Sequence, residues 1–325
     1  MIIGMTCFIV SPLLYTFSSS PLHLFPARIL LGVAVGSTFS IGFVYITELA
    51  GSTVRNLAQG LYMTSMGIGF TMGPLLGGLA AKLWGYTISF YVSGLLGASA
   101  LLFTVLAPKA DVGFRDSPEI VQKGGVVDGF KKVTSNPRIL AVSLANFFNS
   151  MLFNAVITFF PLYGGSMGFD ESQVGTSLAV RGLSSTASRF PTGTASSRFG
   201  ALRLILVGLV VSAITLIVLP LFSDYFIIAV LLGVQGLAYG IYLTSGNVYI
   251  TLEAPIHQRG AAIGVYSTFA NVSGIVSPVL LGALAEAWGF AGAFQVSGIL
   301  ALAGTILTIL TARSRKGASS SNQKS

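Results

Sequence analysis

Long apolar segments alternate with short polar ones along the whole chain. Each apolar segment is close to or above the roughly 20 residues that an α-helix needs to cross the hydrocarbon core of a bilayer. The pattern therefore predicts an all-α membrane protein whose chain crosses the bilayer ten times. The predicted spans are residues 1–17, 24–48, 56–81, 85–107, 138–164, 171–197, 201–222, 224–252, 256–284 and 288–312.

The longest polar segment, residues 108–137, separates the fourth predicted span from the fifth. It predicts a cytoplasmic linker between two helix bundles, an incomplete first bundle of four spans (1–107) and a second bundle of six spans (138–312). The last residues, 313–325, are basic and rich in serine, a composition that is typical of a disordered tail.

Composition excludes the water-soluble classes of protein. Hydrophobic residues make up 53% of the chain and charged residues only 9%, whereas soluble domains carry about 25% charged residues. Cys7 is the only cysteine, so an intramolecular disulfide and a cysteine metal cluster are excluded, and His23 and His257 lack a ligand spacing. The sequence contains no GxxxxGKS or GxxxxGKT loop for ATP. We therefore expect a protein that is not an enzyme, with no cofactor, no metal site and no nucleic-acid partner.

The distribution of Lys and Arg predicts the orientation in the membrane. If the N-terminus is cytoplasmic, 14 of the 18 Lys and Arg residues fall on the cytoplasmic side, and only Lys82 falls on the outer side. The short outer loops instead carry the acidic residues Asp170, Glu171, Asp224 and Glu286. The positive-inside rule thus predicts a multi-pass protein of the cell membrane with both termini in the cytoplasm.

The chain also contains an internal repeat with an offset of 204 residues. The segment GFVYITELAGSTVRNLAQG (42–60) aligns with GNVYITLEAPIHQRGAAIG (246–264), and 12 of the 29 positions from 32 to 60 are identical to their counterparts. Further matches at this offset are Pro74 with Pro278, Trp84 with Trp288, and Gly85 with Gly289. The halves therefore share one design in the same orientation, which is the plan of one large transporter architecture.

The repeat predicts that the first half is incomplete. The second half begins near residue 138, and the counterpart of this position would lie about 66 residues before Met1. About two helices are therefore expected to be missing from the first bundle, and a complete protein of this design would have twelve spans.

With these features the chain resembles transporters of the major facilitator superfamily, here without the first two of their twelve helices. The resemblance covers nearly the whole chain and includes GFTMGPLLGG (69–78), which fits the antiporter motif of the family's fifth helix. Every motif position is filled, by Gly60, Gly69, Gly73, Pro74, Gly77 and Gly78. In the family this motif is typical of proton-coupled exporters. The resemblance implies that these six residues take part in helix packing and gating.

The spacing of the motif also has a physical consequence. Helices in lipid associate by close packing, and Gly69, Gly73 and Gly77 lie four residues apart, on one helix face that a neighbouring backbone can approach. Pro74 removes one backbone hydrogen bond and is expected to bend the helix. We therefore expect a tight, bent seam. The alternative interpretation is ordinary packing of small residues, with no role in coupling.

The resemblance assigns roles to several charged residues. Arg28, followed by Gly32, resembles a fourth-helix motif linked to proton transfer, although Leu31 replaces the frequent polar residue; the alternative is an arginine that reaches the outer surface. The resemblance implies that four other charged residues form a cytoplasmic gate of ion pairs. The alternative is that these residues are solvated charges at the helix ends. These are Glu48, Arg55, Arg198 and Arg259.

Arg181 lies deep in its predicted span, and no acidic residue occurs in the core of any span. Because an unpaired buried cation is costly, we expect Arg181 to face a wet central cavity and to meet an anionic or polar group of a substrate. Bonds to backbone carbonyls are the alternative. Further candidates for the cavity, some of which can instead bond between helices, are Asn146, Asn149, Asn154, Gln235, Tyr239, Tyr242 and Asn247.

Three functions are compatible with the sequence. The leading one is a secondary active transporter, expected to be a monomer in the lipid bilayer, that works by alternating access and exports small amphipathic compounds in exchange for protons. The second is an importer of metabolites or sugars with the same fold. The third is a truncated membrane protein without transport activity, because the first bundle lacks two helices.

Overall fold

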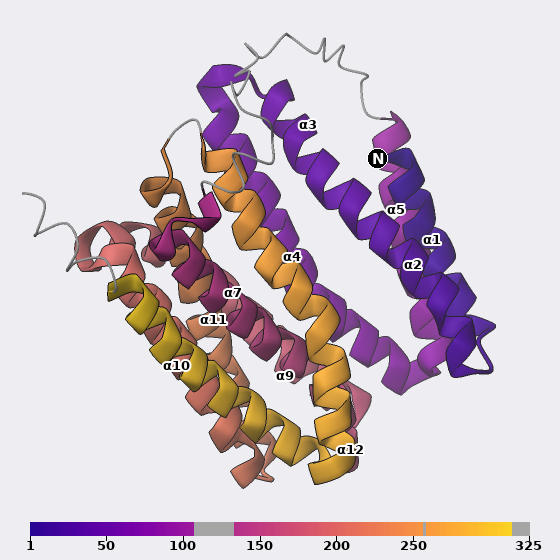
Figure 1. The fold of residues 1–325 in the computed structure, drawn as a ribbon. Coiled ribbons are helices and arrows are strands. Elements are labelled where there is room, and N and C mark those ends of the chain that lie inside the picture. The colour runs from indigo at the N-terminus through magenta and orange to yellow at the C-terminus, as the bar shows by residue number, and fades with distance from the viewer. Residues whose placement is uncertain (107–132, 256–257, 314–325) are drawn as a thin grey trace, which may run out of the picture. The chain divides into compact units, whose positions relative to one another are not determined.

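The structure is a computed structural model that describes residues 1–106, 133–255 and 258–313, without the side chains of several residues between 40 and 59 and of residues 312 and 313. Every regular element in these ranges is a helix, which confirms the predicted all-α class (Figure 1). Most of the predicted linker and nearly all of the predicted tail lie outside the described residues.

The chain forms two compact units. The first contains residues 1–117 and 170–176, and the second contains residues 118–169 and 177–325. Helix α9 (Glu171–Ala195) therefore begins in the first unit and continues in the second.

In the first unit, helices pack around the N-terminal helix α1. Helix α1 packs against α5 and α2, and α4 packs against α5 and α3. Helices α2 and α3 are joined by a π-helical turn, so that they form one continuous segment. The bounds are α1 (Ile2–Thr16), α2 (Leu24–Val35), the π-helical turn (Gly36–Ser40), α3 (Ile41–Leu49), α4 (Gly51–Trp84) and α5 (Tyr86–Leu106).

In the second unit, α12 has the most extensive packing. It lies against α7 and α10, and α10 also packs along α11. Two further π-helical turns interrupt the helices after Asn154 and after Ala195. The bounds, besides α9, are α7 (Pro137–Asn154), α8 (Phe160–Ser166), α10 (Ala201–Val218), α11 (Tyr225–Glu253) and α12 (Arg259–Arg313).

The described helices accommodate the ten predicted spans in fewer continuous segments. Seven helical segments are long and apolar enough to cross a bilayer, and Ile2–Thr16 is a shorter apolar helix. Two of the seven, Glu171–Leu221 and Arg259–Thr311, contain 51 and 53 residues. At a rise of about 1.5 Å per residue each is more than twice as long as the hydrocarbon core is thick, about 30 Å. Each long segment therefore holds two spans.

Glycines with positive φ mark the points where these long segments change direction. Gly200 has φ 86° and Gly289 has φ 71°, and L-residues with a Cβ rarely adopt such angles. Figure 1 shows the result in α12, whose orange and yellow arms meet at the label α12. The sequence pattern separates the two spans of the first segment at residues 198–200, which include Gly200, and those of the second at residues 285–287, just before Gly289.

The same glycine turn occurs in both halves of the repeat. Gly85, between α4 and α5, has φ 84° and ψ 166°, and its repeat counterpart Gly289 has φ 71° and ψ 172°. Only glycine readily adopts this region of backbone space. The matching Trp-Gly pairs in the sequence therefore encode one shared backbone turn.

Glycines also allow close contact between helices in the second unit. A Cβ atom on Gly236 or Gly240 of α11 would lie less than 3.0 Å from the carbonyl oxygen of Arg181 or Ser185 of α9. The two backbones are therefore in direct contact, as is common where small residues recur every four positions in membrane helices. Between α12 and α10 the contact is similar, because a Cβ on Gly298 would lie 2.6 Å from the Ala213 carbonyl oxygen.

Among the described residues, the first unit lacks the corresponding contacts. Gly32 and Gly36, the repeat counterparts of Gly236 and Gly240, have no described atom within 4 Å of the position that a Cβ would occupy. In the most apolar 18-residue stretch of each of its membrane-spanning helices, only 6% to 22% of the residues are buried. The corresponding fraction is 44% to 61% for the segments that start at residue 137 or later. Much of the first unit's helix surface is therefore uncovered by described residues.

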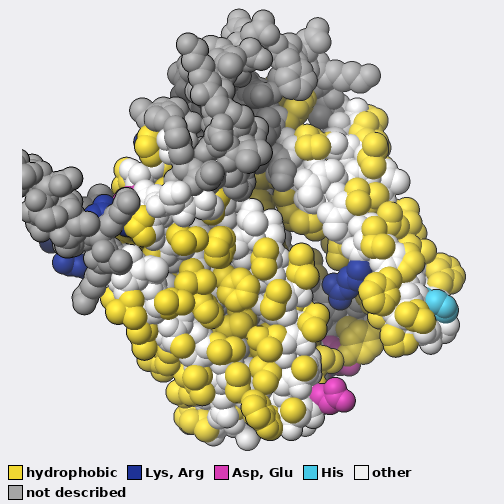
Figure 2. Space-filling view, in the orientation of Figure 1, with side chains coloured by type: hydrophobic (Ala, Val, Ile, Leu, Met, Phe, Trp, Pro, Cys, Tyr) yellow, Lys and Arg dark blue, Asp and Glu magenta, His cyan; other side chains and the backbone are white. Residues whose placement is uncertain are grey.

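Apolar side chains also cover the outer surface of the second unit. Hydrophobic side chains gather over α12 in Figure 2, and Ile275, Val279 and Ile306 of this helix are all exposed. Soluble proteins rarely expose large continuous apolar patches. This surface is suited to contact with lipid.

We predict that Gly236→Val will destabilise the protein. A branched side chain at this position must separate α9 from α11, and overpacking of this kind costs about 1–3 kcal/mol. The thermal unfolding midpoint of the purified protein in detergent measures the effect. Gly274→Val is the matched control, because no described atom lies within 4 Å of its Cβ position. An equal loss of stability in both variants would contradict the role assigned to the α9–α11 contact.

Candidate functional site

Three helices of the second unit bring polar and aromatic side chains together around Arg181. Arg181 comes from α9 and Phe153 from the last turn of α7, while Gln235 and Tyr239 come from α11. Gln235 and Tyr239 are four residues apart, so they lie one above the other on the same helix face. Gly236, between them in sequence, allows α9 to approach this face closely.

The Arg181 guanidinium contacts two aromatic rings and one amide. Its Cζ atom lies 5.0 Å from the centroid of the Phe153 ring and 5.1 Å from that of Tyr239, and the two ring centroids are 5.1 Å apart. Its Nε–H donates a hydrogen bond to Oε1 of Gln235 at 2.5 Å. Only 4% of Arg181 is exposed, and Gln235 is fully buried. Cation–π contacts with desolvated rings are worth about 2 kcal/mol, so the rings offset part of the cost of burying the charge.

Several buried polar atoms of this cluster have no hydrogen-bond partner among the described residues. They are Nη2 of Arg181, Nε2 of Gln235, and Oδ1 of Asn149, which lies one turn before Phe153 on α7. Buried polar groups are hydrogen-bonded in the great majority of cases, so unpaired ones require an explanation. The cluster therefore offers two buried donors without described partners, on Arg181 and Gln235, and an unpartnered acceptor lies on α7 one turn before Phe153.

A second arginine adds to the positive charge of this site. Arg189 follows Arg181 by two helical turns, and its Nη2 donates to Oγ of Ser185 at 3.5 Å. Its charge is close enough to interact electrostatically with both Arg181 and Tyr239. One face of α9 thus carries two positive charges within the span.

The other predicted cavity residues lie elsewhere or serve another contact. Asn146 donates to the backbone carbonyl of Tyr266 at 2.9 Å and so links α7 to α12. Asn247 is exposed and donates to Leu243 of its own helix. Tyr242 is fully buried, and Asn154 is half-buried at the end of α7. The structure brings Gln235 and Tyr239 to Arg181 but not Asn146 or Asn247, and Asn149 lies buried on α7, one turn before Phe153.

The antiporter motif contains one close helix crossing, which is not where we expected it. No described atom lies within 4 Å of the Cβ positions of Gly69, Gly73 and Gly77, or of Gly60. In contrast, a Cβ on Gly78 would lie within 3.0 Å of the Glu171 carbonyl oxygen and at 3.0 Å from the Cα of Gly175. Among the described residues, close approach at the motif therefore occurs in a crossing of α4 and α9 at Gly78, and the seam at the three evenly spaced glycines stays a prediction.

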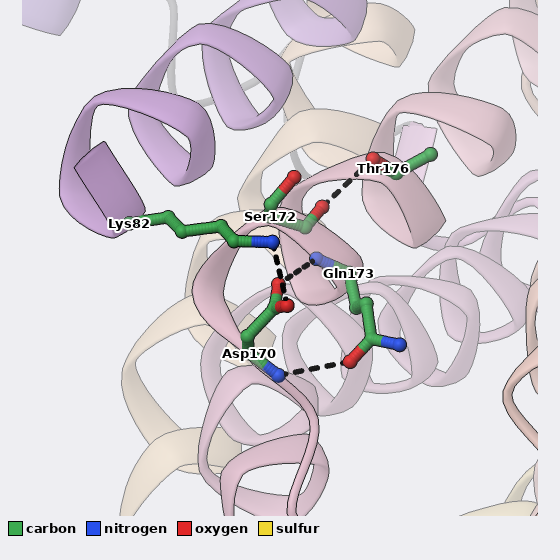
Figure 3. A network of polar contacts seen from close by, with 5 residues as sticks. All are labelled: Lys82, Asp170, Ser172, Gln173 and Thr176. Atoms are coloured by element: carbon green, nitrogen blue, oxygen red, sulfur yellow. Dashed lines mark hydrogen bonds and ion pairs between the residues drawn. The ribbon is translucent and has the colours of Figure 1, made fainter.

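An ion pair lies one helical turn from this crossing (Figure 3). Nζ of Lys82 donates to Oδ2 of Asp170 at 2.9 Å. Oδ1 of Asp170 accepts from the backbone N–H of Gln173 at 2.8 Å, and Oε1 of Gln173 accepts from the backbone N–H of Asp170 at 3.0 Å. This reciprocal arrangement is a capping box at the start of α9, followed by a bond from Thr176 to the Ser172 carbonyl. The Lys82 ammonium and the Gln173 N–H hold the pKa of Asp170 below its usual value.

Arg28 lies in the first turns of α2 and is exposed. Its guanidinium is 5.9 Å from the centroid of the Tyr15 ring in α1. An exposed arginine near a helix end, held against an aromatic ring, fits the interpretation in which the side chain reaches the membrane surface.

The predicted cytoplasmic gate residues are only partly described. Glu48 lies in the last turn of α3 and Arg55 in the first turns of α4, but their side chains are outside the described set. Arg198 is exposed against the ring of Phe199, and Arg259 begins α12.

An ion pair that the sequence analysis did not single out lies at the corresponding end of the second unit. Nη1 of Arg138, at the start of α7, contacts Oε1 of Glu253, at the end of α11, at 3.3 Å. Glu253 is the last residue of α11, and Glu48 is the last but one of α3, one position out of register with it at the repeat offset of 204. The repeat therefore contained an approximate signal for Glu253.

A further signal was available for Lys82 and Asp170. Lys82 is the only basic residue assigned to the outer side, and Asp170 is an acidic residue of an outer loop.

As for metals, no group of three or more His, Cys, Asp or Glu side chains in the described ranges could hold an ion.

Comparison with known proteins identifies the family. The model of the Major Facilitator Superfamily matches residues 1–170 and 142–325, which together cover the whole chain. The chain belongs to the Major Facilitator Superfamily. The predicted resemblance to this superfamily is thereby confirmed, and the chain is a multi-pass membrane protein of a transporter family.

Similar superfamily members include several resistance proteins. The chain is 24% identical to the class B tetracycline resistance protein of Escherichia coli over 82% of its own length and 67% of that protein. It is 24% identical to the quinolone resistance protein NorA of Staphylococcus aureus over 96% of its own length and 79% of that protein. An MFS-type transporter of Methanocaldococcus jannaschii is 23% identical over 93% of this chain and 78% of that protein.

We predict that Asp170→Ala will destabilise this superfamily member more than Asp170→Asn. Asparagine retains the oxygen that caps α9 and loses only the charge that pairs with Lys82, whereas alanine loses both contacts. Asn and Asp are about equally good caps, and alanine is a poor one. Thermal unfolding midpoints of the two variants in detergent measure the difference, and equal midpoints would contradict the dual role of the carboxylate.

The pH dependence of this contact follows from the lowered pKa of Asp170. A carboxyl whose folded pKa lies below its ordinary value of 3.8 stabilises the fold above that value, and the stabilisation is lost as the pH falls through the folded pKa. The difference in unfolding midpoint between the original protein and Asp170→Asn should therefore shrink as the medium is acidified. A difference that grows on acidification would contradict this assignment.

Proposed function

We propose that the protein is a secondary active transporter that exports small amphipathic compounds in exchange for protons. The complete antiporter motif carries this proposal, and the names of similar proteins, which describe tetracycline resistance and quinolone resistance, support it. The transporter acts as a monomer in the cell membrane with both termini in the cytoplasm, since the Lys and Arg distribution favours that orientation.

Alternating access is the mechanism that best fits two similar halves. The Gly78–Gly175 crossing and the nearby Lys82–Asp170 pair connect α4 to the start of α9, and these contacts are candidates for change during the cycle. The proposed set of charges at the cytoplasmic ends of the helices consists of the Arg138–Glu253 pair and of Glu48, Arg55, Arg198 and Arg259. An exposed ion pair contributes about 0–1 kcal/mol, so it can open and close easily.

For proton coupling the described spans supply arginines rather than carboxylates. Arg28 is the candidate that the family resemblance indicates. Because a guanidinium stays protonated, its exposed side chain takes part only through contacts with a titrating group of a further helix. A carboxylate in a helix that precedes residue 1 is the complementary group expected for this scheme.

We also propose that about two helices complete the first unit. The repeat supports this view, because Gly236 and Gly240 are covered by α9, while their counterparts Gly32 and Gly36 face no described atom. The repeat counterpart of α9 would precede residue 1. The same additional helices could cover Gly69, Gly73 and Gly77. Without them, the alternative of a membrane protein that does not transport gains support.

Transport measurements in oriented vesicles test the proposed function. In everted vesicles energised by respiration, an exporter coupled to protons should accumulate amphipathic fluorescent probes, both cationic and anionic ones being tested, and nigericin should abolish the accumulation. Vesicles without the protein are the control. Accumulation only in right-side-out vesicles would indicate an importer, and no transport in either orientation would support the non-transporting alternative.

A substitution tests the proposed additional helices. Gly32→Val should leave the unfolding midpoint of the 325-residue chain nearly unchanged, because no described atom lies within 4 Å of its Cβ position. In a chain extended by the proposed helices it should lower the midpoint, as overpacking costs about 1–3 kcal/mol. Tolerance of Gly32→Val in both chains would argue against helices at this face.

A further inference from the structure

The spans of the second unit contain positive charge without a matching negative charge. Arg181 and Arg189 lie on one face of α9, away from its ends. The described acidic residues of this unit are all remote from that face: Asp224 caps the start of α11, Glu253 pairs with Arg138, and Glu286 lies beside the turn at Gly289. The site therefore has a net positive charge that described protein groups do not neutralise.

Hydrogen-bonding groups at this site favour an anion in the same way. Nη2 of Arg181 and Nε2 of Gln235 are both buried donors without described partners. The bond from Nε of Arg181 to Oε1 of Gln235 holds the two side chains next to each other and leaves these two nitrogen atoms free. Two neighbouring donors, one of them charged, are suited to the two oxygen atoms of a carboxylate.

The aromatic rings provide the apolar part of the site. Phe153 and Tyr239 are stacked, with an interplanar angle of 26°, and both are half-buried rather than fully enclosed. A planar ring system can extend this stack, since offset aromatic pairs contribute about 0.5–1.5 kcal/mol beyond the burial of their area.

We propose that this cluster binds planar aromatic compounds that carry a carboxylate or a similar anionic group. The anionic group contacts Arg181 and Gln235, and the ring system lies against Phe153 and Tyr239. This inference rests on the proposed transport function and adds the charge of the substrate to it. Cationic compounds of the same shape are disfavoured, because they would place a third positive charge beside Arg181 and Arg189.

A binding measurement with two probes of equal shape tests the proposal. The protein is reconstituted in nanodiscs of phosphatidylcholine, and binding of tritiated 1-naphthoate is measured with unlabelled 1-naphthoate or 1-naphthylmethylammonium as competitor. We expect saturable binding that only the carboxylate displaces. Arg181→Gln should weaken it about tenfold to a hundredfold, the range that the loss of a charge-assisted hydrogen bond to a ligand implies. Arg189→Gln should weaken it less.

Controls separate the role of the site from changes in folding or in overall charge. Arg203→Gln removes the same charge from an exposed position at the start of α10 and should leave naphthoate binding unchanged. Arg181→Lys should retain part of the affinity lost in Arg181→Gln. Unfolding midpoints of all variants show whether a loss of binding reflects a loss of the fold.

The anionic group could also be the phosphate of a lipid. Nanodiscs that contain phosphatidylglycerol distinguish the two sources: if anionic lipid alone occupies the site, naphthoate does not bind in phosphatidylcholine and Arg181→Gln changes only lipid binding. That result would overturn the assignment to a transported carboxylate. Equal competition by the ammonium probe, or equal losses in Arg181→Gln and Arg203→Gln, would also overturn it.

Failure of this inference can be told apart from failure of the proposed function. If everted vesicles accumulate a cationic probe while naphthoate neither binds nor is transported, the charge preference is wrong and the exporter proposal stands. If naphthoate binds as described but no probe is transported in either orientation, the binding site stands and the exporter proposal is wrong for this chain.

Discussion

The contact between α9 and α11 determines the position of the candidate site. In lipid the exclusion of water cannot hold helices together, so close approach of backbones replaces it. Gly236 and Gly240 allow this approach, and Arg181 is the residue of α9 that meets Gly236. Because Gln235 and Tyr239 flank this glycine on α11, the same contact that joins the helices places the Arg181 side chain against its amide and aromatic partners.

The surroundings of Arg181 explain how a cation can stay inside a membrane span without a carboxylate. Two rings face the guanidinium and one amide oxygen accepts from Nε, which together offset part of the desolvation cost. They do not neutralise the charge, and one guanidinium nitrogen is left without a described partner. A carboxylate here would lower the cost further but would also remove the attraction for an anionic ligand. The arrangement thus retains binding capacity at some expense of stability.

Sequence patterning predicted the fold class and the spans well, because every span must be apolar over its full length. The turns at Gly85 and Gly289 were also visible as matching Trp-Gly pairs in the repeat. Side-chain partners were harder to predict. Spans that are apolar on all sides carry little amphipathic signal, so the sequence does not show which face packs against which helix. For this reason the motif glycines were expected to form a seam that the described residues show only at Gly78, and the pair between Lys82 and Asp170 was missed.

The comparison of the two halves connects these observations. Equivalent sequence produces equivalent structure where the determinant is local, as in the turns at Gly85 and Gly289, which depend only on glycine's access to positive φ. Equivalence is lost where the determinant is a neighbouring helix, as at Gly32 and Gly36, which face no described atom within 4 Å where Gly236 and Gly240 have α9. A glycine pair without a partner lowers helix propensity by about 1 kcal/mol per glycine relative to alanine and gains no packing in return. The uncovered pair in the first half therefore supports the proposal that a helix equivalent to α9 packs on this surface.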